Sequence, residues 1–140
     1  MNAVATSLER EPLLVVVGGA VAGGKQALFC GLTFADISVR DKWLRDERAA
    51  LFAVVSPDAP DAPFRVAGVV RPEYAVCCSS DGGLNFGCGD IHILPNMDVY
   101  SDFPNGHYDS AGGKGLLVGS AQHAKDFTPS SLEFWSLSCA

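Results

Sequence analysis

Short apolar runs separated by glycine-rich and proline-rich stretches dominate this chain. Residues 12–17 are a proline followed by an unbroken run of Leu and Val, which predicts a buried strand. Residues 18–25 hold four glycines and predict a turn, and the apolar residues 26–34 predict a second strand. Two apolar runs around a glycine turn are typical of a β-hairpin, so the chain is expected to open with one.

Later segments repeat this alternation of strand and breaker. Residues 38–48 surround Trp43 and Leu44 with polar residues and fit either an irregular loop or a short helical turn. Three prolines in residues 57–63 require a loop, and glycines or prolines make loops of 81–90 and 95–114 as well. The remaining predicted strands are 49–56, 64–70, 73–79, 91–94, 115–120 and 130–138.

About eight strands, short connections and no long amphipathic helix predict the fold class. We expect a mainly β protein, an antiparallel two-sheet β-sandwich with few short helices. Residues 1–11 are polar and are expected to be a flexible N-terminus, with 12–140 forming one domain. A chain of 140 residues, 48% of them hydrophobic, has enough apolar material for a core of its own.

Charge narrows the classes of partner. The formal net charge is −6, which argues against nucleic acid or an anionic membrane surface, because both favour basic patches. The one basic cluster, at residues 40–48, has Asp41, Asp46 and Glu47 interleaved and predicts a solvated, salt-bridged segment. No apolar run approaches the ~20 residues of a membrane helix, and residues 1–12 lack a signal sequence, so we expect no membrane insertion and a cytoplasmic location.

The first glycine turn invites comparison with a phosphate-binding loop. Gly19, Gly24 and Lys25 fit the spacing of that motif, but Gln26 stands where a Ser or Thr would hold magnesium. A phosphate loop also opens a helix, whereas the aromatic and glycine content of residues 26–34 favours a strand. We therefore interpret the stretch as a hairpin turn.

Two later segments resemble the TLDc domain, the family of oxidation-resistance proteins and related regulators of the V-ATPase. That family has an aromatic residue, a glycine-x-glycine core, an acidic residue and then a strand, and Phe86 to Ile93 follows this order. Its closing strand has Glu, an apolar residue and an aromatic, as in Glu133-Phe134-Trp135. Matching strand ends are seen at residues 31–33 and 49–57, so the resemblance spans about residues 12 to 138.

The resemblance implies a curved two-sheet sandwich, α+β in the family, without an established active site. It implies a non-enzymatic protein-interaction domain acting in oxidative-stress resistance and in V-ATPase regulation, with V-ATPase subunits as candidate partners. The family normally has a helical portion before the first strand, and this chain has only about ten polar residues there. The domain is therefore expected to be N-terminally short, which would leave part of a sandwich face uncovered and open to self-association or a partner.

The segment 81–90 is the candidate binding site. Its glycines predict positive backbone φ or close packing, and Asp90 could accept N–H bonds from the loop. An exposed thiol in a glycine loop is also the candidate for reversible oxidation, which here is Cys88. The candidate binding residues are Asp81, Gly82, Gly83, Asn85, Phe86, Gly87, Gly89 and Asp90.

Three other kinds of chemistry have candidate residues in the sequence. A metal site is not expected, because no CxxC pair exists and only Cys88 and His92 have tolerable spacing; no cofactor is expected either. A thiol-dependent redox or hydrolase enzyme would pair Cys88 with His92 or His107. A calcium- or carbohydrate-binding module would use the acidic residues of the loop 95–114, although these lack EF-hand spacing. The five cysteines have no regular spacing and are expected to be reduced thiols.

Overall fold

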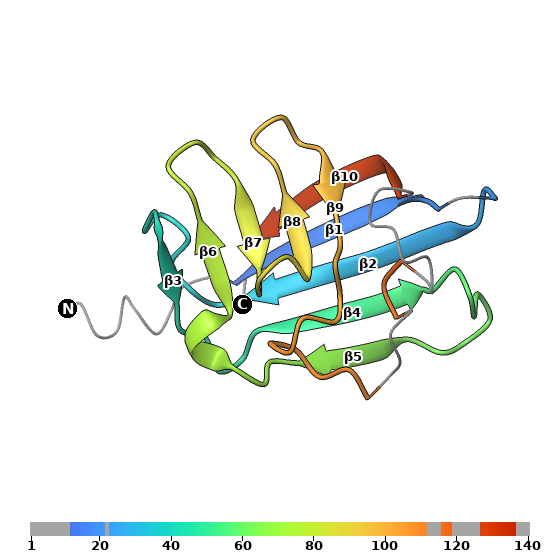
Figure 1. Cartoon of the computed structure of the whole chain (residues 1–140), viewed down its shortest axis with the longest axis horizontal. Helices are drawn as coiled ribbons and strands as arrows, with labels where there is room; N and C mark the ends of the chain where they lie inside the picture. The colour runs from blue at the N-terminus through green and yellow to red at the C-terminus, as the bar shows by residue number, and fades with distance from the viewer. Residues whose placement is uncertain (1–11, 22, 112–115, 119–126, 137–140) are drawn as a thin grey trace.

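The computed structural model describes residues 12–21, 23–111, 116–118 and 127–136, and within them the chain forms ten strands and one short 3₁₀ helix (Figure 1). The longer strands are β1 (Leu13–Ala20), β2 (Gln26–Thr33), β4 (Ala50–Val55), β5 (Arg65–Gly68) and β10 (Thr128–Ser136). The shorter elements are β3 (Lys42–Leu44), η1 (Pro72–Tyr74), β6 (Val76–Cys78), β7 (Leu84–Phe86), β8 (Ile91–Ile93) and β9 (Val99–Tyr100).

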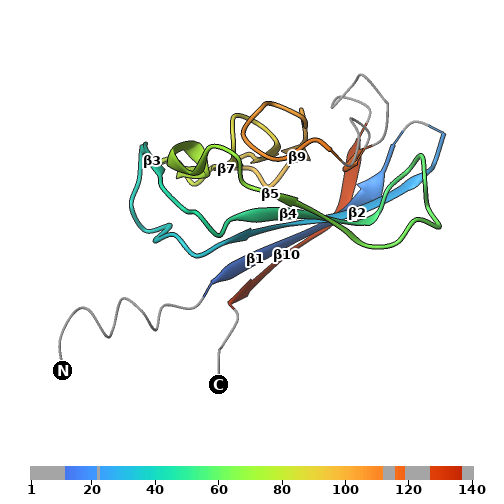
Figure 2. The same cartoon turned by 90° about the horizontal axis from the view of Figure 1, so that it is seen from below.

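These strands build two five-stranded sheets that pack face to face. The first sheet has the order β10-β1-β2-β4-β5 and the second the order β3-β6-β7-β8-β9. Every pair in both sheets is antiparallel. Seen edge-on, the second sheet lies on one side of the first (Figure 2). The predicted fold class, a mainly β antiparallel two-sheet sandwich, is confirmed.

The opening hairpin is confirmed, but its turn is shorter than predicted. β1 and β2 pair from Leu13 opposite Thr33 to Ala20 opposite Gln26, so a strand follows the turn where a phosphate loop would need a helix. Gly23 and Gly24 have positive φ and make the reversal. Gly19, predicted in the turn, lies inside β1, where a Cβ would come within 2.3 Å of the Thr128 carbonyl oxygen. That glycine therefore permits close approach of β10.

Three predicted loops contain strands, and one predicted strand is a turn. β3, β7 and β9 are two or three residues long, too short to establish an alternating pattern, and lie within 38–48, 81–90 and 95–114. In the predicted strand 115–120, residues 116–118 form a turn whose apolar side chains are buried; the rest lies outside the described residues. The Ser56 hydroxyl donates to the Leu116 carbonyl at 2.6 Å and anchors that turn.

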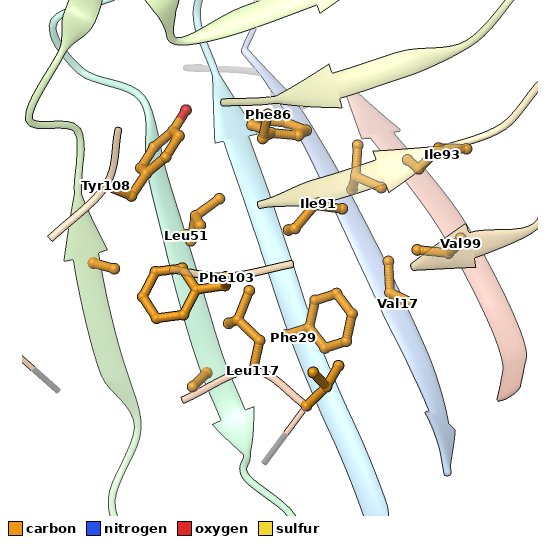
Figure 3. Packing of buried hydrophobic residues seen from close by; sticks show 14 of the residues in the cluster. Val17, Phe29, Leu51, Phe86, Ile91, Ile93, Val99, Phe103, Tyr108 and Leu117 are labelled. Carbon is orange, nitrogen blue, oxygen red and sulfur yellow. The ribbon is translucent and has the colours of Figure 1, made fainter. Parts of the chain in front are cut away.

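The core fills the space between the two sheets (Figure 3). Val17, Phe29 and Leu51 enter it from the first sheet, and all three are fully buried. Phe86 and Ile91 enter it from the second sheet and are equally buried. Alternate residues of β1, β2 and β4 are therefore inside, as the two-residue period of a strand requires, whereas no residue of the edge strand β10 is buried. The opposite face of the first sheet carries the other half of those residues.

Candidate functional site

The predicted binding segment is two turns on either side of β7. In the first turn, Asp81 Oδ1 accepts hydrogen bonds from the Ser79 hydroxyl at 2.6 Å and from the Gly83 N–H at 3.1 Å. The Ser79 bond, supported by the Gly83 bond, holds the pKa of Asp81 below its ordinary value. Gly82, at the tip, has φ +101°, which favours glycine. This turn is closed by its own side chains.

One face of β7 packs into the core between the two sheets. Phe86 is fully buried, and its ring lies 2.8 Å from the position that a Cβ on Gly31 would occupy. Asn85 lies on the opposite face, between Cys77 of β6 and His92 of β8 in the ladder, and is half-buried. The middle of the predicted site thus joins the two sheets together and leaves only Asn85 partly accessible.

Asp90 closes the second turn from inside the protein. It is fully buried; Oδ1 accepts the Asn105 N–H at 3.0 Å, while Oδ2 has no hydrogen-bond partner among the described residues. Burial raises the pKa of Asp90 to about 6, partly offset by the Asn105 bond and reinforced by the negative charge of Asp102. A buried carboxylate with one unpartnered oxygen is costly, so Asp90 is the most energetically sensitive residue of the segment.

Gly87 and Gly89 make room for this arrangement. Gly87 has φ +62°, and a Cβ there would lie 2.0 Å from Asp90 Oδ2. The Gly87 N–H donates to the Ala75 carbonyl at 2.9 Å, and the Asp102 N–H donates to the Gly89 carbonyl at 2.8 Å. The second turn is thereby clamped between the start of β6 and the segment after β9.

The structure separates the candidate residues into two places. Asp81 and Gly82 are exposed at one end of β7, and Cys88 is exposed at the other. Gly83, Phe86, Gly87, Gly89 and Asp90 are buried. The segment therefore presents two small exposed tips on a rigid support.

Cys88 has polar surroundings but no basic partner in the described part of the chain. Its carbonyl accepts a bond from the Asn105 side-chain amide at 2.9 Å, and no hydrogen bond joins its thiol to a described histidine. His92 Nδ1 pairs with the Tyr100 hydroxyl, and the His107 ring packs edge-on against Tyr74. The geometry lends no support to a Cys–His enzyme. Burial raises the pKa of the other described thiols, Cys30, Cys77 and Cys78, away from thiolate character.

The acidic residues of the loop 95–114 do not converge. Asp98 accepts a bond from Asn96, Asp102 lies beside Gly89, and Asp109 Oδ1 accepts the Ala111 N–H. Across the described residues, no group of three His, Cys, Asp or Glu side chains is placed to hold a metal ion. In that same part of the chain no helix is long and apolar enough to cross a membrane.

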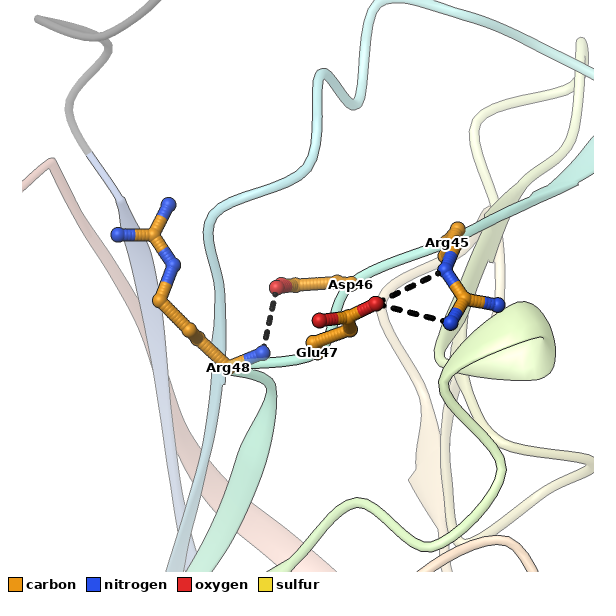
Figure 4. A network of polar contacts seen from close by, with 4 residues as sticks. All are labelled: Arg45, Asp46, Glu47 and Arg48. Atoms are coloured by element: carbon orange, nitrogen blue, oxygen red, sulfur yellow. Dashed lines mark hydrogen bonds and ion pairs between the residues drawn. The ribbon is translucent and has the colours of Figure 1, made fainter.

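Asp46 holds two segments together through hydrogen bonds (Figure 4). The prediction that Asp46 belongs to a solvated, salt-bridged segment was wrong. Its carboxylate is buried and accepts bonds from the Thr33 hydroxyl, the Phe34 N–H and the Arg48 N–H, at 2.7, 2.7 and 3.0 Å. The neighbouring Arg45–Glu47 pair is exposed as predicted, with a 2.8 Å contact. The Arg48 guanidinium lies 4.0 Å above the Phe34 ring.

The largest unexplained feature is the side of the first sheet that faces away from the core, which we call the outer face. In an antiparallel sandwich the residues on this side are normally polar, because they alternate along each strand with the buried ones. Here most of its side chains are apolar, and Phe64, Val66 and Trp135 are 57%, 54% and 52% exposed. The polar residues at described strand positions on this side include Gln26, Ser131 and Glu133. The apolar residues of the outer face are Leu14, Val16, Leu28, Cys30, Leu32, Ala50, Phe52, Val54, Phe64, Val66 and Trp135.

Nothing described covers the outer face. Figure 2 shows β1, β2 and β10 with the second sheet on one side and no described element on the other. Strands that are apolar on both faces are typical of sheets covered on both sides. The apolar runs of 12–17 and 49–56 predict strands that are apolar on both sides. They do not indicate which side of each strand lacks a cover.

Comparison with known proteins gives no family. No protein-family model, no curated protein and no solved structure matches this chain. The TLDc resemblance accordingly stays a prediction.

Proposed function

We propose that this chain is a non-enzymatic protein-interaction domain that acts through its outer face. The observation that carries the proposal is an apolar sheet surface of five strands with no described cover. Large exposed apolar patches on folded domains mark surfaces that bind other proteins. The rigid sandwich beneath it holds that surface in one shape.

The size of the outer face is sufficient for specific binding. Five strands about 4.8 Å apart and about six residues long span roughly 500 Å². Burying that much apolar surface contributes about 12 kcal/mol before the costs of association are subtracted. Those costs are of similar size, so we expect reversible binding.

The resemblance to the TLDc family supplies a narrower proposal for the partner. On that basis the domain would act in the cytoplasm in oxidative-stress resistance, by binding V-ATPase subunits. The exposed tips Asp81-Gly82 and Cys88 are additional contact points in this proposal, with Cys88 as its oxidation-sensitive thiol.

A pull-down with purified V-ATPase subunits at several salt concentrations tests this proposal. The bait is the full chain, and the matched baits are Val66→Ser on the outer face and Met97→Ser in the β8–β9 turn, residues that are 54% and 52% exposed. We expect capture that Val66→Ser weakens and Met97→Ser does not. If Val66→Ser captures as much as the wild type, the outer face is not the binding surface. If the wild type captures no subunit, the V-ATPase is not the partner.

A further inference from the structure

The outer face carries a projecting ring pair and a groove. Stacked rings of Phe52 and Phe64, with centroids 5.4 Å apart, form a ridge over β4 and the start of β5. Beside the ridge, over β1 and β2, lies a groove of about 260 Å³. Its lining is apolar throughout, namely Leu14, Cys30, Leu32, Phe52 and Phe64.

We infer that the occupant of the outer face is a second copy of this chain, in a two-fold symmetric dimer; the inference rests on the proposed function. Ridge and groove are neighbours on one surface, because Cys30 in the groove pairs directly with Phe52 in the ridge. A two-fold axis passing between them places each ridge in the groove of the other copy. Such an isologous contact needs a projection and a hollow side by side on one surface, and the Phe52–Phe64 pair beside the groove supplies both.

Charge favours the same occupant. The net charge is −6, yet the only charged side chain at a described strand position on this side is Glu133, on the edge strand β10. Arg48 lies at another margin, stacked on Phe34. A strongly basic or acidic partner would find little complementary charge here, whereas a second copy whose central strands carry no charge on this side requires none. The acidic groups lie elsewhere and repel only weakly across a Debye length of about 8 Å.

The area predicts how strong the dimer should be. Two outer faces of roughly 500 Å² each bury about 1,000 Å² in total, which is the lower limit for a specific interface. We therefore expect a reversible dimer with a Kd of about 1–100 μM, tightened by added salt because salt screens the acidic surfaces.

Sedimentation equilibrium of the full chain from about 1 to 300 μM tests the dimer, because this concentration range spans the expected Kd. The variants are Phe64→Ser and Val66→Ser on the outer face, with Met97→Ser as the control of equal exposure on the second sheet. Since all three positions are more than half exposed, none should disturb folding, and circular dichroism checks this. Either outer-face variant should raise Kd at least about tenfold, and the control should leave it unchanged.

Alkylation of two cysteines gives an independent readout. Cys30 lies in the groove and is 8% exposed, while Cys88 is exposed on the far turn. With rising protein concentration, the rate of Cys30 alkylation by iodoacetamide should fall in the wild type and stay constant in Val66→Ser. The Cys88 rate should not change with concentration in either protein.

Each outcome decides between the two proposals. A monomer at every concentration overturns the second-copy inference; if that monomer binds a V-ATPase subunit through Val66, the proposed function stands. A monomer that binds nothing through the outer face overturns both. A dimer whose Kd is unchanged in both outer-face variants overturns the inference and assigns self-association to another surface.

Discussion

At the scale of single residues, one contact controls the geometry of the second turn. Asp90 Oδ2 lies 2.0 Å from the position that a Cβ on residue 87 would occupy, so the buried carboxylate and Gly87 depend on one another. The same carboxylate is held by the Asn105 N–H, which joins the segment after β9 to the turn. Two loops far apart in sequence thus depend on one acidic side chain.

Replacing Gly87 with Ala should lower the free energy of unfolding by about 3 kcal/mol or more, because it adds a clash with Asp90 to the strain of positive φ. Gly82→Ala is the matched control: φ is +101° there, but nothing lies within 4 Å of the added Cβ. Urea denaturation of both variants measures the difference. Equal losses would mean that backbone strain, and not the contact with Asp90, determines the cost.

Asp90 should make the protein more stable in mild acid than at neutral pH. Its pKa is about 6 in the folded state, above the ordinary value of 3.8, so the folded protein binds the proton more tightly than the unfolded chain. That contribution is fully present below the unfolded pKa and is lost as pH rises through about 6. Across this window it amounts to about 3 kcal/mol.

The variant Asp90→Asn isolates that contribution, since other groups titrate in the same range. Burial lowers the pKa of His92, for example, which acts in the opposite direction. Denaturation of wild type and variant at pH 4 and pH 7.5 should show that the wild type loses stability relative to Asp90→Asn as pH rises. Parallel pH profiles for the two proteins would contradict the assignment.

At the scale of elements, Asp46 fixes how β2 ends and how the chain enters β4. Three donors from Thr33, Phe34 and Arg48 converge on one carboxylate, which satisfies buried N–H and O–H groups of two segments at once. The corner between the two sheets is therefore set by a side chain and not by a turn sequence.

Asp46→Ala should lower the free energy of unfolding by about 2–4 kcal/mol, because it leaves buried donors without an acceptor. Glu47→Ala is the control next to it; its ion pair with Arg45 is exposed and should be worth less than about 1 kcal/mol. Thermal and chemical unfolding of the two variants gives the comparison. Similar losses at both positions would show that the Asp46 bonds do not stabilise the fold.

At the scale of the whole molecule, the main feature is the outer face, which no described element covers. If the native chain pairs through it, native dimers are favoured by mass action and the urea midpoint rises with protein concentration. We expect this rise in the wild type and in Met97→Ser, and in Phe64→Ser only at concentrations at least about tenfold higher. A midpoint independent of concentration in all three proteins would argue against a native dimer.

The sequence by itself determined the long strands, the opening hairpin and the two-sheet class, because these depend on apolar runs and local glycine or proline. It also marked the glycines of residues 81–90 as positions of positive φ or close packing. Only the tertiary structure decided that β3, β7 and β9 are strands, that Asp46 and Asp90 are buried, and that residues 116–118 enter the core. Two-residue and three-residue strands have no measurable period, and the burial of a carboxylate depends on segments distant in sequence. The outer face was likewise decided in three dimensions, since a run that is apolar on both sides does not say which side is covered.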